Sequence, residues 1–198
     1  MQGPPVNHLR WLISLAVFAA FFLAFPATGE NDLPILAIGA IVAYFLSFPA
    51  CRWFKKTFYR PIILFDLHNV IIAGDFELDD LYELPATRQL VRRVRRHYFT
   101  GALTNFSNEL LDFYNRKFGL FAEFDAVYNS GMFHVRKPHA KFFERVLRDL
   151  GVVAGDVIFI DDREENVAAA RKLGFRSIVF ANAAQLEADL KKMGIRTR

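Results

Sequence analysis

The chain has 198 residues, of which 53% are apolar and 15% aromatic, and its formal net charge is +4. This length suits one domain with additional segments, and so small a charge does not indicate a nucleic-acid-binding protein. The single cysteine, Cys51, excludes an internal disulfide bond and a zinc site made of several cysteines.

Two apolar stretches near the N-terminus contain no charged residue, residues 11–29 and 33–51. As helices, each would reach roughly 28 Å, which is close to the hydrocarbon thickness of a bilayer. The turn between them carries Glu30 and Asp32, whereas basic residues flank only the outer ends. We therefore predict a membrane hairpin over residues 1–56 with two transmembrane helices, and the rest of the chain on the cytoplasmic side.

Two alternatives stay open for these stretches. The first could be a cleaved signal peptide, with Arg10 in its basic region and residues 27–29 as the cleavage site. The second could be a buried helix of a soluble domain. If only the first were removed, the second would still span the membrane, and its basic flank would still hold the remainder in the cytoplasm.

From residue 57 to 198 the sequence alternates short apolar runs with longer amphipathic ones. Strands are predicted over residues 62–65, 98–103, 126–128, 157–160 and 177–180. Helices are predicted over residues 85–97, 107–118, 138–150, 163–173 and 183–193. This alternation favours an α/β fold, a three-layer, Rossmann-like arrangement in which helices cover both faces of a parallel sheet.

Polar residues follow the predicted strands or lie in nearby loops: Asp66, Thr104, Asn105, Lys137, Asp161 and Asp162. In open parallel sheets, ligands bind at the carboxyl ends of the strands. Carboxylates that converge there need a cation, and oxygen ligands favour Mg²⁺. A lysine and a strand-end hydroxyl would hold a phosphate group. Together these residues suit phosphoryl transfer through an aspartyl-phosphate.

The order of these motifs resembles that of the haloacid dehalogenase-like (HAD) hydrolase superfamily, over roughly residues 61–182. The matching segments are ILFD ending at Asp66, GALTN with Thr104, VRKPHAKFF with Lys137, and VIFIDDREENVAAARKLGF with Asp161 and Asp162. Any one of these motifs is weak evidence, but the four in this order are specific. The resemblance implies a phosphatase-like hydrolase with a Rossmann-like sheet.

The resemblance also implies roles for single residues. Asp66 would be the nucleophile and a metal ligand, and the backbone carbonyl of His68 would be a second ligand. Asp162 would bind the metal, with Asp161 beside it as a further acidic ligand. The groups that would grip the phosphate are Thr104, Lys137 and the backbone N–H of Asn105. Asn166 stands where many members carry another acid, and would orient a ligand or a metal-bound water.

His68 departs from the family pattern, because most HAD phosphatases carry a second aspartate two residues after the nucleophile. Three interpretations stay open. His68 could supply the proton to the leaving group, since an unperturbed imidazole has a pKa near 6.5. Catalysis could proceed slowly without a side-chain acid. Alternatively, the protein could bind a phosphorylated ligand without turnover. The dehalogenase branch, which also lacks this aspartate, is a weaker fourth possibility.

The segments that follow Asp66 and Thr104 are too short for a helical cap domain. An open cleft suits a large phosphorylated substrate or one presented by a surface, such as a lipid-linked molecule or a protein at the membrane. We therefore expect a membrane-anchored, Mg²⁺-dependent phosphomonoester phosphatase. The alternative is a catalytically impaired binding or scaffold protein of the same fold at the membrane.

A run of arginines lies opposite the apolar face of the helix predicted at residues 85–97: Arg92, Arg93, Arg95 and Arg96. Such a run is most often a solvated helix face. A contact with acidic lipid is the alternative.

Overall fold

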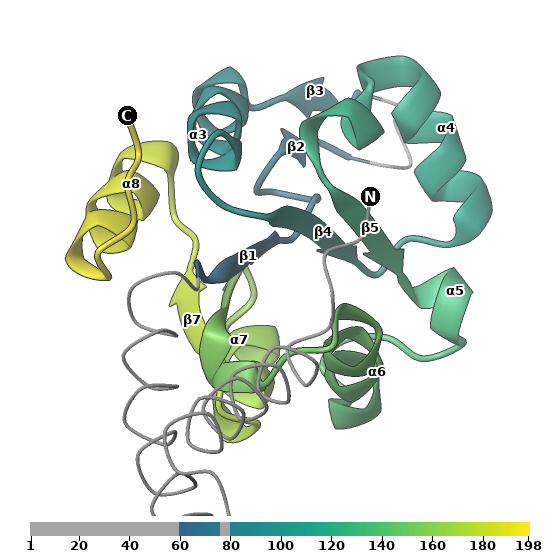
Figure 1. Ribbon diagram of the computed structural model, residues 1–198. Coiled ribbons are helices and arrows are strands. Elements are labelled where there is room, and N and C mark those ends of the chain that lie inside the picture. Colours follow the sequence, from purple (N-terminus) through teal and green to yellow (C-terminus); the bar gives the residue numbers. More distant parts are fainter. Residues whose placement is uncertain (1–59, 76–79) are drawn as a thin grey trace, which may run out of the picture. The chain divides into compact units, whose positions relative to one another are not determined.

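A computed structural model describes residues 60–75 and 80–198, and Arg60–Arg198 form one compact unit (Figure 1). The predicted membrane hairpin at residues 1–56, with helices at about 11–29 and 33–51, lies outside the described residues. Among the residues that are described, no helix is both long and apolar enough to cross a membrane.

The centre of the unit is a five-stranded sheet in the order β5-β4-β1-β6-β7, with every neighbouring pair parallel. Its strands are β1 (Ile62–Phe65), β4 (Thr100–Thr104), β5 (Ala126–Asn129), β6 (Val157–Asp161) and β7 (Arg176–Val179). Each lies within two residues of its predicted start and end. Because all five strands run in the same direction, their carboxyl ends meet at one edge of the sheet.

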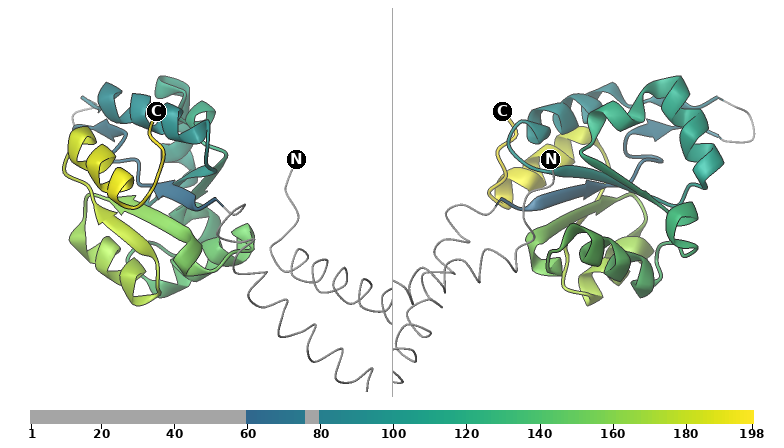
Figure 2. Two further views of the ribbon diagram at one scale, coloured as in Figure 1. Left: turned by 60° about the vertical axis from the view of Figure 1, so that its left-hand side comes forward. Right: turned by 45° about the vertical axis from the view of Figure 1, so that its right-hand side comes forward.

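Helices cover both faces of this sheet (Figure 2). Side chains alternate along β1, so that Ile63 and Phe65 pack into one core while Ile62 and Leu64 pack into the other. The first core also contains side chains of α3 (Pro85–Arg95), α4 (Asn108–Phe118) and α8 (Ala183–Lys192). The second contains side chains of α6 (Ala140–Leu150) and α7 (Glu164–Lys172). The predicted three-layer α/β architecture is confirmed for this unit.

Local signals explain where the helices begin and end. Ser107 caps α4 by accepting a hydrogen bond from the backbone N–H of Leu110, and the helix ends at Gly119 in the left-handed conformation. The predicted start of α6 at Pro138 is wrong, because the helix begins at Ala140 with His139 as its N-cap residue.

Several short elements were not predicted. β2 (Ile72–Ala73) and β3 (Tyr82–Glu83) form an antiparallel hairpin after β1. The others are η2 (Leu120–Glu123), α5 (Ser130–Phe133) and η3 (Ala154–Asp156). Strands of two residues carry too little periodicity to be recognised in a sequence. The described part of the segment between β1 and α3 thus forms a small hairpin instead of a helical cap.

The arginine run of α3 is largely a solvated face, as predicted, because Arg92, Arg95 and Arg96 are exposed, but it also forms ion pairs. Arg92 pairs with Glu123 of η2, Arg93 with Glu187 of α8, and Arg95 with Asp125 just before β5. These ion pairs connect α3 to three neighbouring segments. The sequence could not predict these ion pairs, because the partners are distant in the sequence and have no fixed spacing from α3.

Candidate active site

The strand ends surround a cleft of about 520 Å³. Its walls include most of the predicted site residues: Asp66, His68, Thr104, Asn105, Lys137 and Asp162. Asp161 lies beneath the cleft and is fully buried. Strands β1, β4 and β6 therefore bring together residues that are far apart in the sequence, as the parallel topology requires.

Lys137 lies at the centre of the site with only 2% of its surface exposed. Its ammonium lies 2.8 Å from Oδ1 of Asp66 and 2.6 Å from Oδ2 of Asp161. It also donates a hydrogen bond to the backbone carbonyl of Leu103, 2.6 Å away. Because an ammonium has three donors, these three contacts use all of them. Lys137 thereby fixes the two carboxylates relative to β4.

Asp161 is held from two sides. While Oδ2 accepts from Lys137, Oδ1 accepts from the backbone N–H of Arg163 and from Nδ2 of Asn166, each at 2.9 Å. The amide oxygen of Asn166 is buried and has no hydrogen-bond partner among the described residues. An unpartnered acceptor in the cleft wall suits a water or another donor bound there.

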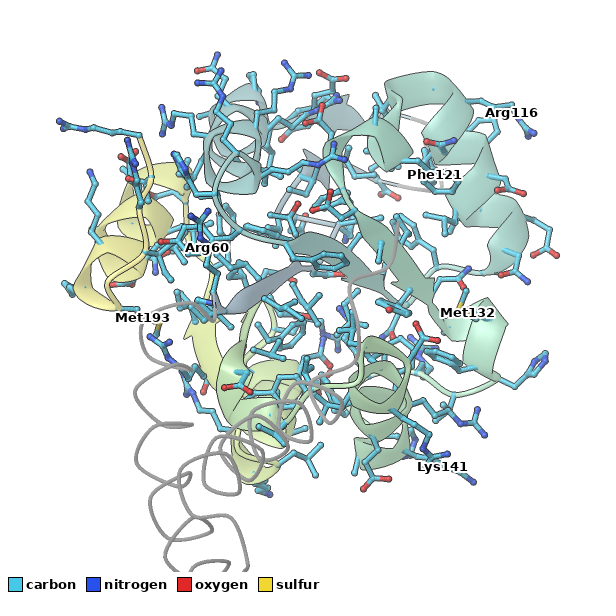
Figure 3. All side chains as sticks on the ribbon, in the orientation of Figure 1. Arg60, Arg116, Phe121, Met132, Lys141 and Met193 are labelled. Carbon is cyan, nitrogen blue, oxygen red and sulfur yellow. The ribbon has the colours of Figure 1, made fainter. Side chains whose placement is uncertain are left out.

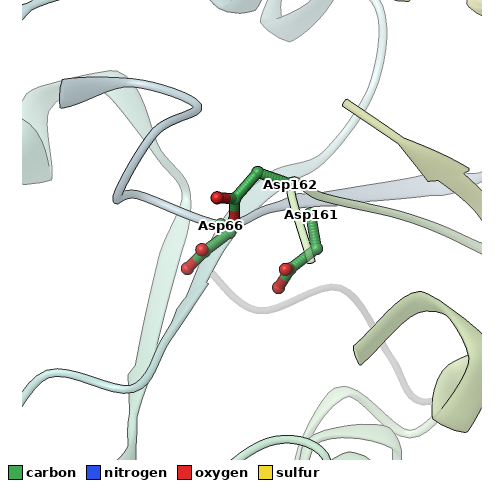
Figure 4. A group of neighbouring side chains, drawn as sticks. All are labelled: Asp66, Asp161 and Asp162. Atoms are coloured by element: carbon green, nitrogen blue, oxygen red, sulfur yellow. The ribbon is translucent and has the colours of Figure 1, made fainter. Parts of the chain in front are cut away.

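Asp162 is more accessible than Asp161. It is half-buried, and its Oδ2 accepts a hydrogen bond of 2.9 Å from Nδ2 of Asn69. Oxygens of Asp66, Asp161 and Asp162 all lie within 4.8 Å of one another, and Figure 4 shows the three carboxylates gathered together. Three carboxylates face one ammonium, so the cluster has a formal charge of −2 when all are ionised.

Burial raises the pKa of Asp66 from 3.8 to about 6. The Lys137 ammonium opposes this rise in pKa, and the neighbouring Asp161 carboxylate adds to it. One lysine thus does not fully offset the cost of burying the ionised Asp66. The charge deficit, the oxygen donors and the unpartnered Asn166 oxygen all fit a hard divalent cation with bound water.

Asn105 acts on the backbone of Lys137. Its Oδ1 accepts from the Lys137 N–H at 2.8 Å, and its Nδ2 donates to the Lys137 carbonyl at 3.0 Å. These two hydrogen bonds hold the backbone at Lys137 against the loop that follows β4. Thr104 is buried in the cleft wall, where its hydroxyl oxygen accepts from the backbone N–H of Phe106 at 3.3 Å. Because the Thr104 hydroxyl accepts in this contact, its own proton can still be donated to another group.

The ring of His68 contacts the β2–β3 hairpin. Its Nε2 lies 3.1 Å from the carbonyl oxygen of Gly74. Because a carbonyl only accepts hydrogen bonds, Nε2 must carry the proton in this arrangement. Gly74 has φ 119°, and a Cβ there would lie 2.8 Å from the backbone oxygen of Asp80. The hairpin therefore needs glycine at the position that holds His68.

The cleft also contains residues that the sequence did not single out as site residues: Asn69, Phe106, Leu110, Arg136 and Arg163. Arg136 directly precedes Lys137 within the RKP motif, so the motif itself was a usable signal. Asn69 has a φ of 60°, which the backbone reveals but the sequence does not. Phe106 lies in the loop after β4, and Leu110 lies in α4. An apolar residue that lines the cleft cannot be distinguished from a core residue in the sequence.

Comparisons with known proteins agree with this geometry. A model of the haloacid dehalogenase-like hydrolase family matches residues 54–174. Among solved structures of the same fold, a HAD family enzyme from Bacteroides thetaiotaomicron, in complex with magnesium and inorganic phosphate, has a TM-score of 0.56. It is 18% identical, and the match covers 62% of this chain and 95% of that one.

Three curated proteins are similar over short segments. Drimenol cyclase drtB of Aspergillus calidoustus is 40% identical over 67 residues, which are 34% of this chain and 13% of that protein. Flavin mononucleotide hydrolase 1 of Arabidopsis thaliana is 45% identical over 60 residues, 30% of this chain and 24% of the relative. Sesquiterpene phosphatase astK of Aspergillus oryzae is 31% identical over 70 residues, 35% of this chain and 36% of the relative.

The matched segment thus spans well under half the length of each of these curated relatives. The family model, by contrast, covers more than half of the present chain and includes all four motifs. The chain belongs to the haloacid dehalogenase-like hydrolase family.

Proposed function

We propose that the protein is a Mg²⁺-dependent phosphatase that works through an aspartyl-phosphate on Asp66. The observation that carries this proposal is the arrangement of Asp66 and Asp161 on one lysine, with Asp162 beside them and a charge deficit that a divalent cation would offset. Two of the relatives are named as a phosphatase and a mononucleotide hydrolase, which supports the same class of reaction.

Asp66 and Asp162, with the backbone carbonyl of His68, are the proposed metal ligands, and bound Mg²⁺ would neutralise charge on the phosphate. Asp161 was also predicted as a ligand. Its oxygens already accept from Lys137, Arg163 and Asn166, so we assign it the positioning of Lys137 instead. A protein of the same fold that was crystallised with magnesium and phosphate supports the choice of ion.

In the first step, an oxygen of Asp66 bonds to phosphorus and the bond from phosphorus to the leaving oxygen breaks. The Thr104 hydroxyl and the Asn105 N–H donate to phosphate oxygens. Lys137 contributes chiefly through its charge, because its three donors are already in use. Water then attacks the aspartyl-phosphate, which releases inorganic phosphate and restores the carboxylate.

We further propose that His68 protonates the leaving oxygen. Since Nε2 donates to Gly74, the proton would come from Nδ1 of a doubly protonated ring. The same contact favours a second candidate, a binding protein with little turnover. A ring tied to the hairpin has less freedom to follow a leaving group than the aspartate that most family members carry at this position.

We also propose that residues 1–56 anchor the hydrolase domain to a membrane on its cytoplasmic side. The charge pattern around residues 11–29 and 33–51 supports this. An anchored enzyme suits a phosphorylated substrate that is lipid-linked or protein-bound. The intact protein should resist carbonate extraction, and a tag at Asn31 should be accessible only from outside. A tag protected on the cytoplasmic side would contradict the hairpin.

The direct test of the enzyme proposal is phosphate release by the full-length chain from an aryl phosphate, with and without Mg²⁺. Turnover that requires Mg²⁺ supports a phosphatase. If the protein shows no turnover but binds orthophosphate in a Mg²⁺-dependent manner, the binding candidate replaces it.

A further inference from the structure

Arg136 places a positive charge in the cleft wall on a fixed piece of backbone. The N–H of Lys137, which belongs to the peptide that joins it to Arg136, donates to Asn105 at 2.8 Å. The carbonyl of Arg136 accepts from the N–H of His139 at 3.0 Å. These hydrogen bonds therefore fix the backbone of Arg136 relative to Lys137.

The guanidinium of Arg136, by contrast, is exposed and makes no hydrogen bond or ion pair with any residue that the structure describes. The other arginine in the cleft wall, Arg163, pairs with Glu165 at 2.6 Å. A guanidinium presents a planar set of donors that matches the oxygens of a phosphate group. Arg136 is thus available to bind a second anionic group of the substrate, in addition to the phosphate that Lys137 and Thr104 would bind.

A further part of the cleft wall is apolar. Phe106 and Leu110 line it, and both also pack into the core on the α3 side of the sheet. Their anchoring in the core gives the cleft a fixed apolar surface, and burying an organic group against it is favourable. A cleft of about 520 Å³ has room for more than orthophosphate.

The residue at position 68 limits which leaving groups the site can serve. An alcohol leaves as a strongly basic alkoxide and needs a proton. A phosphate monoester, whose second pKa is about 6, is a weak base and leaves without one. A phosphate leaving group therefore depends less than an alkoxide does on proton transfer from His68, whose ring is tied to the carbonyl of Gly74.

We propose that the preferred substrate is an organic diphosphate with an apolar group, and that Arg136 binds the phosphate that leaves. This inference rests on the proposed phosphatase function and names its leaving group. The terminal phosphorus forms a bond to Asp66, and its bond to the bridging oxygen breaks. The bridging oxygen keeps the electron pair and departs as part of the organic monophosphate, while Phe106 and Leu110 contact the organic group. Water then releases the terminal phosphate from Asp66.

The test compares hexyl diphosphate with hexyl phosphate as substrates of the full-length protein in detergent micelles with Mg²⁺. Initial release of inorganic phosphate gives kcat/KM for each. Wild type should prefer the diphosphate at least tenfold. Arg136→Gln should lower kcat/KM for the diphosphate by about 10- to 100-fold, the range expected for a lost charged hydrogen bond, and change that for the monophosphate less than about threefold.

The matched control is Arg116→Gln, which removes the same charge from the outward side of α4 (Figure 3). It should leave both substrates unchanged. Arg136→Lys, which keeps the charge but not the planar donors, should retain part of the preference. A binding readout is independent of turnover: Arg136→Gln should weaken inhibition by a methylene-bridged hexyl diphosphonate but not inhibition by orthophosphate.

The outcomes separate this inference from the function on which it rests. If wild type hydrolyses neither substrate, the proposed phosphatase itself is wrong. If it hydrolyses both equally well, or if Arg136→Gln slows both alike, the phosphatase stands and the diphosphate preference is overturned. Release of hexanol and diphosphate, in place of hexyl phosphate and orthophosphate, would also overturn it.

Discussion

The described domain contains two clusters of charged side chains, each with a buried centre, that differ in their charge balance. The proposed catalytic cluster, called the catalytic cluster below, consists of Asp66, Asp161, Asp162 and Lys137. The arginine cluster consists of Glu83, Arg88, Arg92 and Glu123. Three carboxylates meet one ammonium in the first, whereas two carboxylates meet two guanidiniums in the second. The second cluster is neutral within itself, and the first is not.

The net pKa shifts of the carboxyl groups at the two centres are opposite, although burial alone would raise both pKa values. Burial raises the pKa of Asp66 to about 6, because Lys137 is shared with Asp161. Burial also works to raise the pKa of Glu123, but hydrogen bonds from Arg92 and Arg88 outweigh it and lower that pKa. Glu123 lies 2.7 Å from each guanidinium. A fully paired carboxylate stabilises the fold, while an underpaired one at a cleft is poised for a cation and substrate.

The largest expected effect comes from replacing one carboxylate in each cluster by the matching amide. Asp66→Asn should lower kcat at least about ten-thousandfold, because an amide is a poor nucleophile. Glu123→Gln should change kcat by less than about twofold at temperatures where it stays folded. Steady-state phosphate release measures both. Comparable losses of kcat in the two variants would break the distinction between a catalytic and a structural cluster.

The next largest effect concerns His68, whose contribution should depend on the leaving group. His68→Ala should slow hydrolysis of an alkyl phosphate by about a hundredfold to ten-thousandfold and have much less effect on an activated aryl phosphate. Activity on the alkyl phosphate should fall as the pH rises through the imidazole pKa. His68→Asp should preserve or raise activity. Equal rates for wild type and His68→Ala on an alkyl phosphate would refute the acid role.

The arginine cluster should dominate stability. Glu123→Gln leaves Arg88 paired only with the exposed Glu83, and breaking a buried pair costs up to about 3–5 kcal/mol. Denaturant unfolding should therefore show a lower free energy of unfolding for this variant than for wild type. Glu165→Gln, at an exposed pair with Arg163, is the control and should cost less than about 1 kcal/mol. Similar losses for both variants would mean that the arginine cluster is not structural.

The catalytic cluster should make the metal-free protein sensitive to pH. The pKa of Asp66 in the folded state, about 6, is above its ordinary value of 3.8. The protonated group therefore stabilises the fold at low pH, and this contribution of up to about 3 kcal/mol is lost as the pH rises through 6. Unfolding in a chelator at pH 4.5 and 7.5 measures the difference.

Two further measurements sharpen this prediction. Asp66→Asn should remove most of the difference in the free energy of unfolding between the two pH values, because an amide does not titrate. Mg²⁺ should raise the stability of wild type at pH 7.5, and Asp162→Asn should reduce that gain. A wild-type free energy of unfolding that does not fall between pH 4.5 and 7.5 would show that Asp66 is not underpaired.

Much of this fold follows from local sequence signals. The run at residues 62–65 and its polar successor Asp66 predicted both a buried strand and its polar end, because apolar runs and strand-end polar residues are local features. The parallel topology then predicted that Asp66, Thr104, Asp161 and Asp162 would meet, and Lys137 was placed with them from a nearby loop. The roles of these residues followed from the motifs that the chain shares with its family.

Interactions that depend on distant partners could not be predicted. The pairing of Arg92 with Glu123 requires α3 and η2 to be adjacent, and no spacing in the sequence encodes that. The contact between His68 and Gly74 depends on a hairpin of two-residue strands. For the same reason, the sequence alone did not show that the exposed arginines of α3 also form ion pairs.

The central claim is that Asp66 forms a covalent bond to phosphorus. Acid-quenched full-length protein, incubated with a ³²P-labelled phosphate ester and Mg²⁺, should carry label that hydroxylamine removes. Peptide mapping should place that label on Asp66. Label should be absent from Asp66→Asn and present in Glu123→Gln. Turnover without any label on Asp66, or label retained in Asp66→Asn, would contradict this account.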